Sequence, residues 1–224
     1  MSQQIISTRN LQKVYQIADI STIAIEDISF DVNTGDFIAI MGPSGCGKST
    51  LLNILGLLDK PTDGEYYFLD RDVSAYSEGM RSKLRKGNIG FIFQNCNLIY
   101  DLTVHQNIEL PLLYLKYKPN DIRNKVKKIL EYMEISVLKD RYPYQLSGGE
   151  QQRVSLSRAI VFEPKLILAD EPTGNLDSNN TKKLMELLTQ LNNGGQTIIL
   201  VTHEPECARY CHKTLNILYG RITE

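Results

Sequence analysis

The sequence contains no apolar run long enough to cross a bilayer, and its start is unlike that of a secreted protein. A transmembrane helix needs about 20 consecutive apolar residues, and the 224-residue chain contains no such run. The opening segment, MSQQIISTRN, has no basic patch followed by an apolar core, so it does not predict a secretory signal. We therefore expect a chain that reaches a membrane only through a partner.

An excess of one charge and a cysteine framework are also missing. The sequence has 25 Lys and Arg against 26 Asp and Glu, a net charge of −1. This balance gives no electrostatic footprint for nucleic acid, so no nucleic-acid partner is expected. The four cysteines, Cys46, Cys96, Cys207 and Cys211, are scattered through the chain. Without an export signal, we interpret them as reduced thiols rather than disulfides.

Hydrophobic periodicity predicts a parallel α/β core. Residues 37–41, 166–170 and 197–202 are short continuous apolar runs, as expected of buried parallel strands. The segment 180–191, between the last two runs, has helical spacing, and so does much of 101–145. The length leaves room for one α/β core with a small inserted subdomain.

The stretch before the first buried run predicts a further strand. Ile28, Phe30 and Val32 alternate with polar residues, which places them on one face of the strand. Residues 33–36, NTGD, form a turn signal. We therefore predict that this strand pairs with the one at 37–41, and that residues 64–69 form another strand.

Residues 42–49, GPSGCGKS, match the phosphate-loop pattern GxxxxGK[ST] between a predicted strand and a predicted helix. Glycines allow the backbone N–H groups to converge on a polyphosphate, and the following helix directs its positive end at the anion. Lys48 supplies a charge for the β- and γ-phosphates, and the Ser49 hydroxyl suits Mg²⁺. The expected nucleotide-binding residues here are Gly42, Ser44, Gly45, Cys46, Gly47, Lys48, Ser49 and Thr50.

The apolar run LILAD ends in two carboxylates. Asp170, at the tip of the predicted strand, is placed to hold Mg²⁺. Glu171 would then orient or deprotonate the water that attacks the γ-phosphate. An apolar strand followed by Asp-Glu is common in proteins, so this interpretation depends on the phosphate loop that precedes it.

The third motif, LSGGEQQR at 146–153, has two glycines that open a predicted helix, so it offers a second anion site at a helix N-terminus. One chain thus carries two such sites but only one lysine loop. That arrangement makes sense if Ser147, Gly148 and Gly149 complete the nucleotide pocket of another copy.

Together these motifs resemble the ATP-binding-cassette family, and the match covers essentially the whole chain. The resemblance implies a P-loop NTPase of the α/β class, with a RecA-like parallel sheet core, an N-terminal antiparallel β subdomain and an inserted α-helical subdomain. It implies one domain over 1–224. Approximately 1–94 and 150–224 would form the catalytic core with the β subdomain, and 95–149 the helical subdomain that carries the signature motif.

The resemblance also implies ATP and Mg²⁺ as cofactors and an ATP-dependent head-to-tail homodimer. Tyr15 resembles the aromatic that stacks on adenine, and Gln94 the glutamine that contacts Mg²⁺ and the attacking water. Asp177 resembles the working residue of a loop that crosses the dimer interface, and His203 the switch histidine at the γ-phosphate. The implied catalytic residues are therefore Glu171, His203 and Gln94, and the metal ligands Ser49, Gln94 and Asp170.

The motif EPTGNLD at 171–177 resembles that of one branch of the family, which includes lipoprotein-release, macrolide-export, antimicrobial-peptide-resistance and cell-division ATPases. That branch implies an integral membrane permease as partner and a place on the cytoplasmic face of the membrane. The chain stops at Glu224, so no appended regulatory domain is expected. Leu98, Ile99, Tyr100 and Leu102 would either meet the permease or pack within the helical subdomain.

Some alternatives remain open at this stage. A soluble ABC ATPase without a permease, such as an iron–sulfur assembly factor, would carry the same motifs. His203, Cys207, Cys211 and His212 have spacings that allow a metal site, although a core role for the cysteines is the favoured interpretation. Cys46, inside the phosphate loop, could make ATP binding sensitive to oxidation.

Overall fold

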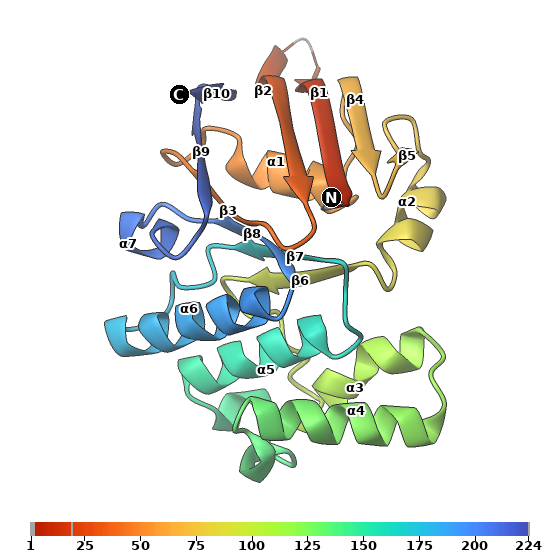
Figure 1. The fold of residues 1–224 in the computed structure, drawn as a ribbon, viewed down its shortest axis with the longest axis vertical. Helices are drawn as coiled ribbons and strands as arrows, with labels where there is room; N and C mark the ends of the chain where they lie inside the picture. The colour runs from red at the N-terminus through yellow and green to blue at the C-terminus, as the bar shows by residue number, and fades with distance from the viewer. Residues whose placement is uncertain (1–2, 19, 224) are drawn as a thin grey trace.

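The computed structural model describes residues 3–18 and 20–223 (Figure 1). It contains two β-sheets and a layer of helices. The elements in chain order are β1 (Gln4–Ile17), β2 (Ile20–Asn33), β3 (Phe37–Met41), α1 (Lys48–Leu55), β4 (Asp63–Phe68), β5 (Arg71–Asp72), α2 (Glu78–Arg85), β6 (Ile89–Phe93), α3 (Val104–Tyr114), α4 (Pro119–Tyr132), the 3₁₀ helices η1 (Ser136–Leu138) and η2 (Pro143–Gln145), α5 (Gly148–Ile160), β7 (Leu166–Asp170), α6 (Ser178–Asn193), β8 (Thr197–Val201), α7 (Pro205–Ala208), β9 (Lys213–Leu218) and β10 (Arg221–Thr223).

The central sheet has the strand order β10-β9-β3-β8-β7-β6. All neighbours from β9 to β6 are parallel, and β10 is an antiparallel edge strand. The three predicted apolar runs form β3, β7 and β8, and nearly every residue of them is buried. The prediction of a parallel α/β core is therefore confirmed. Because the strands are parallel, their carboxyl ends meet at one edge of the sheet.

The second sheet, of order β2-β1-β4-β5, is antiparallel. Ile28, Phe30 and Val32 of β2 are buried, as their alternation predicts. The predicted pairing of this strand with the one at 37–41 is wrong, because β2 pairs with β1 while β3 lies between β9 and β8. The physical reason is the side-chain pattern: β3 is apolar on both faces and suits a sheet covered on both sides, whereas β2 alternates and suits a sheet with one wet face.

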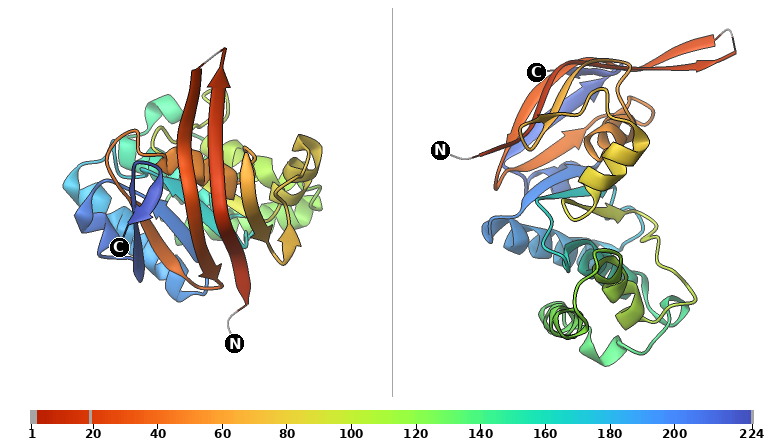
Figure 2. Two further views of the ribbon diagram at one scale, coloured as in Figure 1. Left: turned by 90° about the horizontal axis from the view of Figure 1, so that it is seen from above. Right: turned by 90° about the vertical axis from the view of Figure 1, so that its right-hand side faces the viewer.

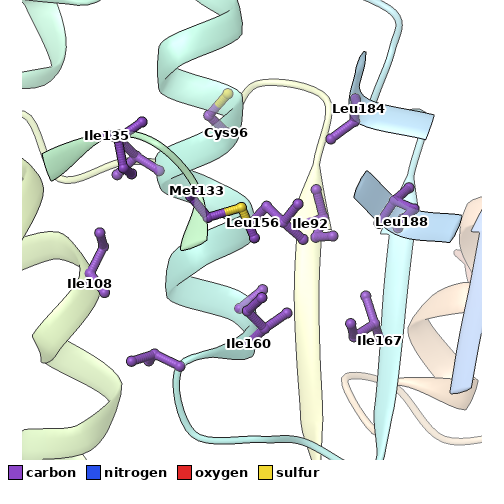
Figure 3. Close-up of a cluster of buried hydrophobic side chains, with 14 of the residues drawn as sticks. Ile92, Cys96, Ile108, Met133, Ile135, Leu156, Ile160, Ile167, Leu184 and Leu188 are labelled. Atoms are coloured by element: carbon purple, nitrogen blue, oxygen red, sulfur yellow. The ribbon is translucent and has the colours of Figure 1, made fainter. Parts of the chain in front are cut away.

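Helix α1 packs between the two sheets, where its residues join a buried cluster with β1, β2 and β4. The opposite face of the central sheet is covered by α5 and α6, with α3 and α4 packed beyond α5. Figure 3 shows Ile92 of β6 and Ile167 of β7 facing the helices that carry Leu156, Ile160 and Leu188. The buried cluster continues into α3 and α4, and the helical-subdomain boundaries at 95 and 149 stay a prediction.

The β1–β2 hairpin extends past the other elements at the side away from the helical layer (Figure 2). Tyr15 lies near its outer end and pairs with Thr22 across the ladder. None of the helices in the described part of the chain has the length and hydropathy that a membrane span requires.

Candidate nucleotide-binding and hydrolytic site

The strand order of the central sheet brings four sequence-predicted segments to one edge. The phosphate loop follows β3, His203 follows β8, Glu171 follows β7 and Gln94 follows β6. Since β3, β8, β7 and β6 are consecutive neighbours, these segments lie side by side although they are far apart in the sequence. A ligand site at the carboxyl ends of parallel strands is the usual arrangement of open α/β sheets.

The phosphate loop connects β3 to α1 and depends on its glycines. Gly47 is the N-cap of α1 with a φ of 103°. A Cβ there would lie 2.3 Å from the backbone oxygen of Ala24, so the loop can approach β2 only with glycine at this position. The Lys48 ammonium group donates to the carbonyl oxygens of Gly42, at 2.9 Å, and Pro43, at 2.8 Å. The loop thus folds around its own lysine, and Ser49 in the first turn of α1 lines a pocket. A helix N-terminus at a pocket is suited to an anion.

A polar pocket of about 330 Å³ lies beside the phosphate loop. Its lining contains the predicted metal ligands Ser49, Gln94 and Asp170, and the predicted base Glu171, together with Phe93, Asn95 and Asn97. Burial raises the pKa of Asp170 and the nearby Glu171 carboxylate adds to this, while the Ser49 hydroxyl and Lys48 oppose it. The pocket therefore holds a concentration of oxygen donors that matches the preference of Mg²⁺.

Glu171 and His203 face each other at this edge. Their Oε1 and Nδ1 atoms are 3.3 Å apart. Glu171 has a φ of +45°, a left-handed conformation that costs energy in a non-glycine residue. Its N–H donates to the carbonyl oxygen of Val201 at 2.9 Å, which fixes the turn against β8. The strained backbone thus holds the carboxylate at the strand tip, next to the histidine.

Gln94 is held from the loop that follows Glu171. Its Nε2 donates to the Asn175 Oδ1 at 3.4 Å, and the Asn175 Nδ2 donates to the Gln94 backbone oxygen at 3.2 Å and to the Asn95 Oδ1 at 3.0 Å. A Cβ on Gly174 would lie 2.6 Å from the Gln94 Nε2. The two loops are therefore in direct contact, and Gly174 makes room for the glutamine.

Tyr15 is oriented by two charged residues that the sequence analysis did not identify. The Lys13 ammonium lies 4.9 Å from the centroid of its ring, and the Tyr15 hydroxyl donates to Asp59 at 3.1 Å. Lys13 and Asp59 are themselves 2.7 Å apart. Burial raises the pKa of Tyr15, with the Thr50 hydroxyl as a near neighbour. The ring therefore lies by Thr50 in the first turn of α1.

The signature residues Ser147, Gly148 and Gly149 lie elsewhere, at the start of α5. The Ser147 hydroxyl and the Glu150 carboxylate form a capping box. A Cβ on Gly149 would lie 2.7 Å from Asn180 Oδ1, so α5 begins directly against α6. In the described contacts these residues meet the 175–180 segment rather than the phosphate loop of their own chain.

Asp177 is the N-cap of α6, where its carboxylate accepts from the Asn180 N–H at 2.9 Å and the Asn180 Nδ2 at 2.6 Å. These contacts lower its pKa. This capping role accounts for an aspartate here without a partner subunit, and the predicted interface role stays a prediction. Asn95 and Asn97 also line the pocket and were not predicted as site residues, since isolated asparagines in a loop form no recognisable motif.

The four cysteines are buried or partly buried. Cys207 is buried with its thiol 3.2 Å from the Glu204 carboxylate, and burial raises its pKa to about 11. Among the described residues there is no group of three or more His, Cys, Asp and Glu side chains arranged to hold a metal ion. The Cys46 side chain belongs to the buried cluster around α1.

The geometry defines a P-loop NTPase, and the similarity to known proteins is more specific. The family model described as ABC transporter matches residues 25–174. The chain is 47% identical over 219 residues to an uncharacterized ABC transporter ATP-binding protein of Methanocaldococcus jannaschii, covering 98% of each. It is 42% identical over 219 residues to the lipoprotein-releasing system ATP-binding protein LolD of Aquifex aeolicus, covering 98% of this chain and 96% of that one.

Its structure is similar to that of an ATP-binding cassette of M. jannaschii in a dimeric post-hydrolysis state with ADP and Pi. The TM-score is 0.90, the identity is 38%, and 98% of this chain and 97% of the other are covered. The chain therefore belongs to the ABC transporter family. The family resemblance, the fold class and the expectation of an ABC-type ATPase are therefore confirmed.

Proposed function

We propose that the chain is the ATP-hydrolysing subunit of a membrane transporter, acting as a homodimer on a permease. The observation that carries this function is the convergence of the phosphate loop, the 330 Å³ pocket and the Glu171–His203 pair at one sheet edge. The relatives named as ATP-binding proteins and the ADP-bound cassette support ATP as the nucleotide.

Mg²⁺ fits the donor set of the pocket. The Ser49 hydroxyl, the Asp170 carboxylate and the Gln94 amide oxygen would hold it, because a hard cation prefers such ligands. When bound, the ion neutralises charge on the β- and γ-phosphates. Lys48 would add a second positive charge at the same phosphates.

Glu171 would orient the attacking water and accept its proton. A carboxylate in a polar pocket, with an acceptor oxygen directed by a neighbouring histidine, is suited to that role. His203 would keep the carboxylate in place and lie close to the γ-phosphate. Tyr15 would stack on adenine, held by Lys13 and Asp59.

The position of the signature motif supports the homodimer. Ser147, Gly148 and Gly149 open α5 against the 175–180 segment, so they can serve a nucleotide bound by a second copy. The related cassette is dimeric in its ADP-bound state. A dimer with two Mg-ATP at the interface would use both anion sites of each chain.

A second pocket, of about 390 Å³, would receive a cytoplasmic segment of the permease. Its apolar lining includes Leu58, Phe91, Phe93 and Tyr114, and the Phe91 and Phe93 rings stack with centroids 5.7 Å apart. Phe93 also lines the hydrolytic pocket, so only the Phe93 side chain would lie between a segment bound here and Gln94.

The apolar residues after Gln94, which were predicted either to meet the permease or to pack inside the helical subdomain, differ in exposure. Leu98 is buried, whereas Ile99 and Tyr100 are exposed. Docking in the second pocket would place the chain on the cytoplasmic face of the membrane.

Tyr114→Glu tests this docking site. The Tyr114 side chain is 63% exposed at the pocket rim, so a carboxylate there disturbs the apolar surface without opening the core. We expect the variant to keep its basal ATPase rate and to lose roughly tenfold of its affinity for the permease. The measurement is co-purification with the membrane protein encoded by the adjacent gene, followed by an ATPase assay of the complex.

Tyr219→Glu is the matched control, because Tyr219 is 88% exposed and lies next to β10, at the other end of the central sheet. Wild-type permease binding by the Tyr114 variant would rule out this pocket as the docking site. If the wild-type chain bound no membrane protein, the transporter assignment itself would fail.

A further inference from the structure

The loop that connects Gln94 to the helical layer has an unusual backbone. Cys96 and Asn97 are consecutive residues with φ values of 58° and 46°, in the left-handed region. Non-glycine residues adopt it singly and at an energetic cost, so two in succession need support from their surroundings. This turn presents Asn95 and Asn97 to the hydrolytic pocket and fixes the exit of the chain from Gln94.

The support comes from α5, the helix that begins at the signature motif. Arg158 donates from Nη2 to the Cys96 carbonyl oxygen at 2.7 Å and from Nη1 to the Asn97 carbonyl oxygen at 2.6 Å. The Ser155 hydroxyl also donates to the Cys96 carbonyl oxygen, at 3.2 Å. One guanidinium thus binds the carbonyls of both left-handed residues in a planar, two-pronged contact.

The side chain of the turn is held by the same helix. The Cys96 thiol donates to the Gln152 Oε1 at 2.6 Å, and the Gln152 Nε2 donates to the Pro172 carbonyl oxygen at 2.9 Å, next to Glu171. Burial raises the pKa of Cys96 to about 11, so the thiol keeps its proton at neutral pH. Gln152 therefore bridges the loop after Gln94 and the loop after Glu171.

Arg158 has no carboxylate within ion-pair distance among the described residues, and burial lowers its pKa. A half-buried arginine without an anionic partner loses hydration, and here carbonyl dipoles replace it. A side chain that served only to fill space would not need a guanidinium. The two hydrogen bonds instead fit a residue that stabilises the conformation of this turn.

We propose that Arg158 is a positioning residue for hydrolysis, which holds the Cys96–Asn97 turn and thereby sets Gln94 against the Asp170–Glu171 pair. The same contact ties α5, and with it the signature motif, to the hydrolytic pocket of its own chain. A nucleotide bound at the signature motif by a second copy would then act on this pocket through α5. This inference rests on the proposed function.

The test compares Arg158→Gln with the wild type in the full chain. We expect kcat for ATP hydrolysis to fall roughly tenfold, because a catalytic group displaced by about 1 Å loses up to about a hundredfold in rate. KM for ATP should stay within about twofold, since the phosphate loop and Tyr15 are untouched. Arg158→Lys should keep part of the rate, because its ammonium reaches one carbonyl at a time.

A double-mutant cycle with Gln94→Ala separates positioning from packing. If Arg158 acts through Gln94, Arg158→Gln should cause no further loss in the Gln94→Ala background, whereas independent effects would multiply. Lys125→Gln is the charge-matched control, because Lys125 lies on α4, where it pairs with Glu163 and has no described hydrogen bond or ion pair with the turn. Rate losses that multiply in the double variant would overturn the proposal. So would an Arg158→Gln variant that loses thermal stability but keeps the wild-type kcat.

The Asn97 position gives an independent test should Arg158→Gln not fold. Asn97→Gly and Asn97→Val both remove the exposed amide, but only valine is strained at a φ of 46°. The valine variant should therefore have several-fold lower kcat than the glycine variant, and equal rates would contradict the inference. A wild-type chain that did not hydrolyse ATP would refute the proposed function instead, so the two failures are distinguishable.

Discussion

Glu171→Gln is expected to reduce ATP hydrolysis by at least about a hundredfold while ATP binding is kept. The amide has the size of the carboxylate and can still contact His203, but it cannot accept a proton from water. Loss of a positioned general base costs about 10²–10⁴-fold in rate. The proposed dimer holds its two Mg-ATP at the interface, so ATP that is bound and not hydrolysed should keep the two copies together and ATP-bound dimers should accumulate. Steady-state phosphate release and the molecular mass in solution with ATP measure the two effects.

Glu206→Gln is the matched control for this variant. Glu206 lies three residues after His203, is exposed, and does not line the pocket that contains Glu171. The same chemical change there should leave the hydrolysis rate and the mass distribution as in the wild type. Hydrolysis by Glu171→Gln at the wild-type rate would show that another group activates the water, and the base assignment would be wrong.

The hydrolytic edge could be predicted because its residues are marked by local patterns. Lys48 and Ser49 follow a glycine-rich turn, and Asp170 and Glu171 end an apolar run. Since each buried run predicts a parallel strand, and since parallel strands end at one edge, the motifs imply a common site without knowledge of the strand order. Family resemblance was still needed for Gln94, His203 and Tyr15, whose local sequences are unremarkable.

The partners of these residues could not be predicted, because their contacts join distant segments. Asp59 meets Tyr15 across 44 residues of sequence, and Arg158 reaches the Cys96 carbonyl over a separation of 62. The pairing error at 33–36 has the same origin. A turn signal gives a change of direction, but only the burial requirements of β2 and β3 decide which sheet each joins.

The second large effect is expected for Gly47→Ala, which should weaken ATP binding at least tenfold and also destabilise the chain without nucleotide. The φ of 103° disfavours any side chain, and the new Cβ would lie 2.3 Å from the Ala24 oxygen and 2.8 Å from the Ile25 Cγ2. Backbone strain of this kind costs about 1–3 kcal/mol. The neighbours on β2 cannot retreat, because β2 is hydrogen-bonded to β1.

Gly195→Ala separates the conformational part of this effect from the steric part. Gly195 has a φ of 95°, close to that of Gly47, but a Cβ there would meet nothing within 4 Å. Its variant should lose only about 1 kcal/mol of stability and bind ATP as the wild type does. Denaturant unfolding and nucleotide titration, performed on both variants, provide the comparison. Equal losses of stability in the two variants would mean that the contact with β2 adds nothing to the cost of a side chain at Gly47. A larger loss for Gly47→Ala, together with weaker ATP binding, would show that glycine is needed there for the close approach of the loop backbone to β2.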